Sequence, residues 1–152
     1  MPTVNRQSGF TLIELMVVLV LVAIVAGIAI PSMSDLIDRH RVTSVTNSSL
    51  GLLNFARSEA IRRGQAVIVT SAGNSMTATL AADGSIVRQN EPAEGGVTIS
   101  AGQVRFEGSG LTAQALGAET TFQVCGPEAG DQGQQLSVAG GGRTSSVAVN
   151  CP

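Results

Sequence analysis

A long apolar segment near the amino terminus constrains the fold of this chain more than any other feature. No charged residue occurs from Leu15 to Ile30, and the apolar character extends back to Phe10. As a helix with a rise of ~1.5 Å per residue, residues 10–30 would be roughly 31 Å long, close to the thickness of a bilayer's hydrocarbon core. We therefore expect residues 10–30 to form a transmembrane helix, preceded by a short polar leader, residues 1–9.

A cleaved secretory signal peptide is the alternative interpretation of these residues. Arg6 would supply its positive region, and Gly27-Ile28-Ala29 would supply a small-residue cleavage site. The apolar run, however, is longer than the ~7–15 residues of a signal peptide's hydrophobic region. In addition, Glu14 places a carboxylate inside the run, which costs on the order of 2.5–3.5 kcal/mol at membrane depth.

The composition argues against most classes of enzyme. Only 13% of the residues are charged, and every basic residue is Arg. Without Lys the chain can form neither a Walker-type phosphate-binding loop nor a Schiff base. One His and two Cys cannot complete a standard zinc site without carboxylates. We therefore expect no enzymatic activity, no cofactor and no metal. We expect His40, between Arg39 and Arg41, to lie on a solvated helix face or to contact lipid headgroups.

Helical periodicity continues beyond Pro31, now with one apolar side and one polar side. We expect a single helix over residues 10–63, kinked or loosened at Pro31 and capped by Gly64. Its amphipathic half, residues 31–64, would pack on a head formed by residues 65–152. The stripe that faces this head would contain Val45, Ser49, Leu52, Ala56 and Ala60.

From Gln65 onward the pattern changes to the alternation that is typical of β-strands, interrupted by Gly and Asp clusters that indicate turns. Residues 126–135 are rich in Gly and acidic residues, and we expect an exposed loop there. The head is predicted to be an antiparallel sheet or small sandwich packed on the helix, an α+β fold. The expected strands are Ala66–Ser71, Met76–Ala81, Ser85–Gln89, Val97–Ser100, Gln103–Glu107, Thr120–Cys125, Gln135–Ala139 and Ser145–Asn150.

The start of the apolar segment carries a short motif, Gly9–Leu15 (GFTLIEL). Taken alone, Thr11 and Glu14 have the spacing of a helix capping box, in which each side chain satisfies a backbone amide of the other residue. The whole motif, with the polar leader before it and Pro31 beyond the apolar run, resembles the prepilin processing site of type IV pilins and type II secretion pseudopilins.

This resemblance implies a processing pathway. A prepilin peptidase would cut between Gly9 and Phe10 on the cytoplasmic side, and Phe10 would become the N-methylated first residue. The apolar helix would hold the subunit in the bacterial inner membrane, with the head in the periplasm, until an assembly platform moved it into a filament. Glu14 and Pro31 would serve assembly.

A looser resemblance covers most of the chain. Leu53–Ala60 (LNFARSEA), the later segments Val104–Phe106 and Phe122–Cys125, and Gly142-Arg143 are similar to the GspH/FimT family of minor pilins and pseudopilins. On this reading Cys125 and Cys151 lie in the periplasm, where disulfides persist. We expect them to form a disulfide, the alternative being two buried free thiols.

The family resemblance leaves three functions open. The first is a structural minor pilin that helps to initiate or tip a type IV pilus, with other pilin subunits as partners. The second is a GspH-like minor pseudopilin of a type II secretion system. The third, ranked lowest, is a FimT-like minor pilin for DNA uptake, whose Gly-Arg-x-Arg element is here only partly matched because Ser145 follows Arg143 where a second Arg would stand.

Nucleic acid is not expected as a partner, because affinity for a duplex depends on basic contacts to phosphates. We expect Arg143 to cap a turn or to pair with one of the acidic residues of the head. The head contains the basic residues Arg88, Arg105 and Arg143 and the acidic residues Asp83, Glu91, Glu94, Glu107, Glu119, Glu128 and Asp131.

Overall fold

The computed structural model describes residues 10–115, 117–128, 130 and 132–152, except the side chains of residues 28–32 and 35. The expected leader, residues 1–9, lies outside the described residues. The chain divides into two compact units, with the boundary between Leu36 and Ile37. Each unit is described by itself below.

A single helix, α1 (Leu12–Arg63), begins in the first unit and ends in the second. The predicted helix over residues 10–63 is therefore confirmed to within two residues. α1 continues through Pro31, whose side chain lies outside the described residues. Gly64 follows the helix with φ +64° and donates a backbone hydrogen bond to Ile61, as expected of a glycine that caps a helix. Within the part of the chain that the structure describes, no helix is long and apolar enough to cross a membrane.

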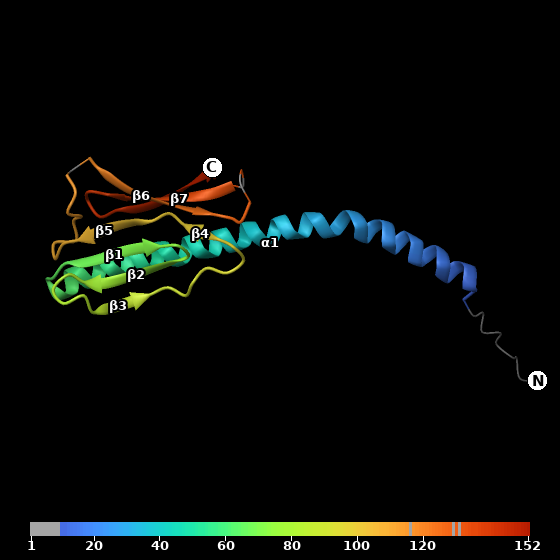
Figure 1. Ribbon diagram of the computed structural model, residues 1–152, viewed down its shortest axis with the longest axis horizontal. Helices are drawn as coiled ribbons and strands as arrows, with labels where there is room; N and C mark the ends of the chain where they lie inside the picture. Colours follow the sequence, from blue (N-terminus) through green and yellow to red (C-terminus); the bar gives the residue numbers. More distant parts are fainter. Residues whose placement is uncertain (1–9, 116, 129, 131) are drawn as a thin grey trace, which may run out of the picture. The chain divides into compact units, whose positions relative to one another are not determined.

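The described residues of the second unit form two antiparallel four-stranded sheets (Figure 1). The strand order is β3-β2-β1-β5 in the first sheet and β4-β6-β7-β8 in the second. The predicted antiparallel head is therefore confirmed, as a pair of sheets rather than a single one. The strands are β1 (Val67–Ala72), β2 (Ser75–Leu80), β3 (Ile86–Gln89), β4 (Thr98–Ile99), β5 (Gly102–Phe106), β6 (Glu119–Cys125), β7 (Gln132–Ala139) and β8 (Thr144–Asn150).

The position of β7 corrects the predicted loop at residues 126–135. β7 begins at Gln132, three residues earlier than expected, because Gln132, Gly133 and Gln134 pair with the last three residues of β8. These residues are polar or lack a side chain, so they carry no strand-like alternation. Their conformation depends on a partner strand rather than on local propensity.

One hydrophobic core joins α1 to both sheets. Alternate residues of each inner strand point into it, for example Val67 and Val69 of β1 and Phe122 and Val124 of β6. Among the described residues, the helix contributes four fully buried apolar side chains, which lie at helical spacing on one face: Leu52, Leu53, Ala56 and Ala60. In Figure 1 strands β1 to β3 run along the second half of α1, which agrees with this shared core.

The short segment around β4 connects the two sheets. Ile99 donates its backbone N–H to Gly73 in the β1–β2 turn, while Ser100 donates its own to Gln123 of β6. The Ser71 hydroxyl also donates to the Ser100 carbonyl oxygen at 2.6 Å. The segment around β4, a strand of only two residues, therefore connects the first sheet to the second sheet by hydrogen bonds.

Candidate assembly site and the residues that support it

Thr11 caps the start of α1. Its hydroxyl oxygen accepts the backbone N–H of Glu14 at 3.3 Å, and its carbonyl oxygen accepts the N–H of Leu15. This is one half of a capping box. Among the described residues, no hydrogen bond or ion pair involves the Glu14 carboxylate. The backbone of Glu14 thus serves the cap, and its side chain projects from the helix without a partner in the described part of the chain.

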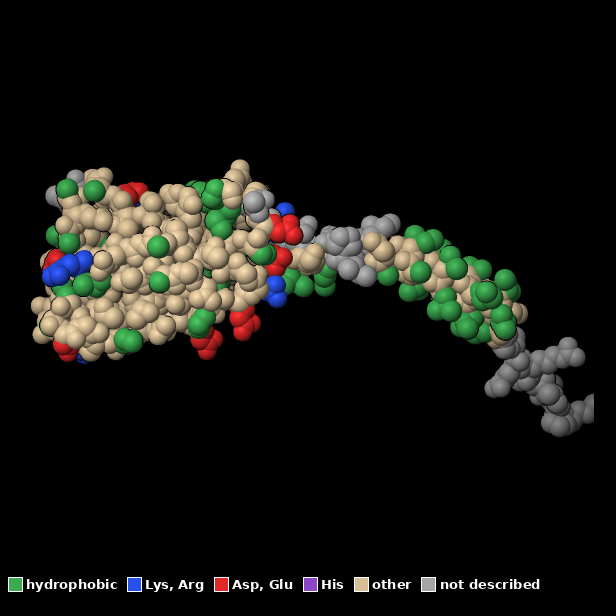
Figure 2. Space-filling model, in the orientation of Figure 1, with side chains coloured by type: hydrophobic (Ala, Val, Ile, Leu, Met, Phe, Trp, Pro, Cys, Tyr) green, Lys and Arg blue, Asp and Glu red, His purple; other side chains and the backbone are tan. Residues whose placement is uncertain are grey.

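Apart from Glu14, the helix that follows Thr11 is apolar on every side as far as Val25. Phe10 is 84% exposed, and the large apolar side chains from Leu12 to Val25 are at least half exposed. Figure 2 shows this segment covered with apolar side chains. A helix that is apolar all round needs a surrounding of lipid or of other apolar helices. The first unit supplies no such surrounding within its described residues. Gly9, the residue expected to precede the processing cut, lies outside the described part of the chain.

Arg57 fastens the carboxyl-terminal half of α1 to two turns of the head. Its Nε donates to the carbonyl oxygen of Gly110 at 3.0 Å, and its terminal nitrogen donates to Gly141 at 3.2 Å. Gly110 lies between β5 and β6, and Gly141 lies in the turn between β7 and β8. One guanidinium therefore holds a loop beside the first sheet and a turn of the second sheet against the same helix.

Glu59, two residues later, has a buried side chain that pairs with two more exposed arginines, Arg62 and Arg63. Its side chain is only 8% exposed and accepts hydrogen bonds from Arg62 at 2.6 and 2.9 Å and from Arg63 at 2.5 Å. The hydrogen bonds from Arg62, and then those from Arg63, lower the pKa of the Glu59 carboxyl from 4.5 to about 2. The spacing of Glu59 and Arg63 predicts only a weak surface pair. The i,i+4 pair is present, and Arg62 binds the same carboxylate, which the spacing of Glu59 and Arg63 alone does not predict.

These contacts explain the LNFARSEA motif in physical terms. Ala56 and Ala60 are fully buried against the sheets, where a small side chain allows close packing. Arg57 and Glu59 make the hydrogen bonds described above, and the Ser58 hydroxyl donates to the Phe55 carbonyl oxygen. The motif therefore attaches α1 to the head through buried alanines and through the hydrogen bonds of Arg57.

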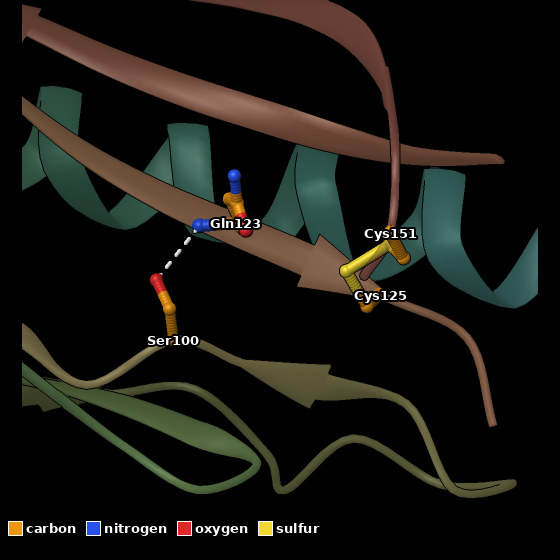
Figure 3. The surroundings of a disulfide bond; sticks show 4 residues. All are labelled: Ser100, Gln123, Cys125 and Cys151. Carbon is orange, nitrogen blue, oxygen red and sulfur yellow. Dashed lines mark hydrogen bonds between the residues drawn. A yellow bond between two sulfur atoms is a disulfide. The ribbon is translucent and has the colours of Figure 1, made fainter. Parts of the chain in front are cut away.

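Cys125, the last residue of β6, forms a disulfide with Cys151, directly after β8 (Figure 3). The predicted pairing is confirmed. Gly133 of β7 lies against this bond, and a Cβ at that position would come within 2.6 Å of the Val124 carbonyl oxygen as well as contacting the Cys151 sulfur. Figure 3 also shows the Gln123 backbone donating to the Ser100 hydroxyl at 2.8 Å, beside the disulfide.

The three arginines of the head do not converge on one face. Arg88 pairs in register with Ala78, whose side chain is buried, and its guanidinium lies 5.0 Å from the ring centre of Phe55 on α1. Arg105 lies opposite Ile68 of β1, which is the residue before the buried Val69 and therefore points to the other face of the sheet. The Arg105 side chain forms an ion pair with Glu107 at 2.7 Å. Cross-strand neighbours share a face and successive residues alternate. Arg88 and Arg105 therefore project from opposite faces of the first sheet.

Arg143 stands at the turn before β8 with its side chain exposed. Only its backbone carbonyl is engaged, by the N–H of Ala139. Among the described residues, its guanidinium makes no hydrogen bond and no ion pair. Neither the expected turn cap nor the expected acidic pair is formed by the Arg143 guanidinium within the described residues, and Asp131, one of the candidate acids, lies outside them.

His40 is exposed on α1 between Arg39 and Arg41, as the sequence predicted. Arg41 forms an ion pair with Asp38 at 2.9 Å. Among the described residues, no three His, Cys, Asp or Glu side chains gather closely enough to hold a metal ion.

Relatives of this chain include fimbrial proteins and pilins. A "Fimbrial protein" of Pseudomonas aeruginosa is 41% identical over 64 residues, which are 42% of this chain and 41% of that protein. The "Type IV major alpha-pilin" of Moraxella bovis is 48% identical over 42 residues, 28% of this chain and 26% of that one. The "Type IV major fimbrial protein FimA" of Dichelobacter nodosus is 35% identical over 100 residues, 62% of each chain. The chain thus spans 41% of the length of the Pseudomonas relative.

Three further matches cover the head and the amino terminus. The crystal structure of the type IV minor pilin FimU of Pseudomonas aeruginosa has a similar fold, with a TM-score of 0.60 at 22% identity over 71% of this chain and 89% of that one. Residues 4–30 match the "Prokaryotic N-terminal methylation motif". Residues 45–142, more than half of the chain, match the family described as "Type II transport protein GspH". The chain therefore belongs to the GspH family and is a type IV pilin-like protein of the GspH/FimT kind.

Proposed function

We propose that this chain is a structural minor pilin that helps to initiate or tip a type IV pilus. The observation that carries the proposal is the helix from Leu12 to Val25, which apart from Glu14 is apolar on every side and has no cover among the described residues. A filament core of parallel apolar helices would provide that cover. The similar fold of FimU, a minor pilin by its description, supports the same role.

The proposal assigns a place to each part of the chain. Residues 1–9 are the leader, removed between Gly9 and Phe10 by a prepilin peptidase, and Phe10 is then N-methylated. Residues 10–30 span the inner membrane once and later enter the filament core. Residues 31–64 carry the head, residues 65–152, in the periplasm, where the Cys125–Cys151 disulfide is stable.

Glu14 is proposed to pair with the amino group of Phe10 on a neighbouring subunit. A carboxylate in an apolar helix bundle requires an opposite charge, because an unpaired ion in a low dielectric is strongly unfavourable. Two observations support the assignment: the Glu14 carboxylate has no partner among the described residues, and the cap of α1 uses the Glu14 backbone instead.

The test compares two variants of the start of the helix in the native bacterium. Glu14→Ala removes the charge but keeps the backbone donor of the cap, and Thr11→Val removes the cap but keeps the charge. We expect both to be processed and inserted, and only Glu14→Ala to be lost from purified filaments. Equal incorporation of Glu14→Ala and the unchanged chain would contradict the pairing. Loss of Thr11→Val alone would favour the capping role.

The second candidate function is a GspH-like minor pseudopilin of a type II secretion system. The family match favours it as directly as it favours a pilus. We rank the pilus first because the disulfide suits a subunit that works outside the cell. Deletion of the gene separates the two: loss of surface pili with normal protein secretion supports the pilus, and the reverse supports the pseudopilin. On either reading the chain is a structural subunit rather than an enzyme.

DNA uptake remains the lowest-ranked role for this chain. Arg88 and Arg105 face opposite sides of the first sheet, and of the three arginines of the head only Arg143 has a guanidinium without a partner among the described residues. Phosphate contacts add up only when several basic groups share a surface.

A further inference from the structure

The edges of the two sheets differ in how well they are protected from pairing with another strand. Exposed edge strands present unpaired backbone groups, and proteins usually block them with short length, charge, proline or a bulge. Among the described strands, the outer positions belong to β3, β5, β4 and β8.

Three of these edges carry a blocking feature. β3 is four residues long, contains Arg88 and shifts register against β2. β4 has only two residues. β5 carries Arg105 in an ion pair with Glu107. None of the three offers a long, regular and uncharged edge.

β8 lacks every one of these features. Its seven residues, TSSVAVN, contain no charge and no proline, and they pair with β7 without a register shift. The side chains from Ser145 to Ala148 are exposed, including Val147 at 57%. The strand is held firmly on its inner side by β7 and at its end by the Cys125–Cys151 disulfide.

The pairing pattern identifies which backbone groups of β8 face outward. Ala139 donates to Arg143, so these two residues form a hydrogen-bonded pair. Bonded and non-bonded pairs alternate along an antiparallel ladder. Ser145, Val147 and Val149 therefore bond to β7, while the N–H and C=O groups of the alternate residues point away from it. These outward residues are Thr144, Ser146, Ala148 and Asn150.

A positive charge stands at one end of this edge. Arg143 precedes Thr144, and its guanidinium is exposed and unpaired among the described residues. A strand that runs antiparallel to β8, as all neighbours in this sheet do, would bring its carboxyl-terminal end opposite Arg143. A carboxylate at that end would be matched in charge.

We propose that the outer edge of β8 is a docking site for an extended segment of another polypeptide. The segment adds an antiparallel strand to the second sheet, is uncharged over the length of β8, and carries an acidic side chain opposite Arg143. Backbone hydrogen bonds supply the affinity, and the acidic residue sets the register. This surface lies on the head and goes beyond the proposed role in a filament, so either inference can fail without the other.

The test uses the full chain in detergent and a labelled, amidated peptide, TVTVTVTD, with TVTVTVTN as its matched control. Fluorescence anisotropy should show that the chain binds the acidic peptide. Its affinity for the control peptide should be about threefold lower, which corresponds to the usual contribution of an exposed ion pair. Arg143→Gln should remove the difference between the two peptides. If both peptides bind equally to the unchanged chain, the acidic register is overturned.

A proline at an outward position tests the backbone contact directly. Ser146→Pro removes an outward N–H and leaves the bonds to β7 intact, whereas Ser146→Ala keeps that N–H. We expect Ser146→Pro to weaken peptide binding about fivefold or more, and Ser146→Ala to bind normally. Equal binding by both variants overturns the proposal.

Hydrogen exchange gives a measurement that needs no variant. The amides of Ser146 and Ala148 should exchange more slowly when the peptide is added, while that of Val147 is slow throughout. Unchanged exchange at Ser146 and Ala148 overturns the proposal. The proposal is also overturned if the chain forms a dimer that does not bind the peptide and that Ser146→Pro dissociates. In that case a second copy of the chain occupies the edge of β8.

Discussion

The Nε of Arg57 donates a hydrogen bond to the carbonyl oxygen of Gly110 at 3.0 Å, across 53 residues of sequence. Gly110 has φ +81°, and a Cβ there would lie 2.6 Å from the end of the Ile61 side chain. The arginine of the family motif thus contacts a turn that can approach the helix because it has no side chain. This contact, with the second bond to Gly141, ties the head to α1 at its far end.

Replacing Arg57 with Met should destabilise the head. The variant keeps much of the aliphatic stem and leaves two carbonyl oxygens without their charged donor, which costs about 1–3 kcal/mol. Urea unfolding of the full chain in detergent measures the change. Arg39→Met, at an exposed position, is the control and should unfold like the unchanged chain. An equal loss in both variants would show that the Gly110 and Gly141 contacts contribute nothing specific.

Glu59 should make stability depend on pH in the acidic range. Its folded-state pKa of about 2 lies below the ordinary 4.5, so its contribution is present above about pH 4.5 and is lost as the pH falls toward 2. Glu59→Gln should therefore destabilise the chain at pH 6 and much less at pH 2.5. Glu107→Gln, in the exposed pair with Arg105, should show little change at either pH. A pH-independent effect of Glu59→Gln would contradict the ionic origin of the contribution.

The disulfide should contribute measurably to the stability of the second sheet. Replacing Cys125 and Cys151 together with Ser opens a loop closed across 26 residues, and we expect a loss of roughly 2–4 kcal/mol. Unfolding of the unchanged chain with and without reductant provides a second measurement. An alkylating reagent added to the denatured, unreduced chain should label neither thiol, and two labelled cysteines would exclude the bond.

Processing should require a small residue before the cut. Gly9→Val should leave full-length precursor in the membrane, while Gly9→Ala should still yield a chain that begins at Phe10. Mass spectrometry of the purified protein reads the amino terminus directly. A mature terminus near Pro31 would instead support the secretory signal interpretation.

The chain should not bind duplex DNA appreciably. In a gel-shift titration at low salt, we expect no complex at micromolar concentration, because the head has few basic groups and they are dispersed. Micromolar binding that Arg143→Ala abolishes would reverse this conclusion and favour the DNA-uptake role.

Local pattern accounts for much of what could be predicted from the sequence. The apolar run and the helical stripe that follows it specify α1, because helical periodicity depends on residues three and four apart. Alternation around Val67 and Val69 locates β1, and Gly73-Asn74 specifies the two-residue turn to β2, where Gly73 has φ +67°. The processing motif and the disulfide pair also follow from residues and their resemblance to a known family.

The remaining features depend on contacts between distant residues and were decided only by the tertiary structure. Local alternation cannot say that β1 pairs with β5, or that the strands divide into two sheets joined at Ser100. The early start of β7 follows from pairing with β8, and the burial of the Glu59 side chain cannot be predicted from its spacing to Arg63. Arg143 remains without a partner among the described residues because folding placed no described acidic side chain beside it. Pairing and burial are set by the whole packed head, so they cannot be read from any short segment.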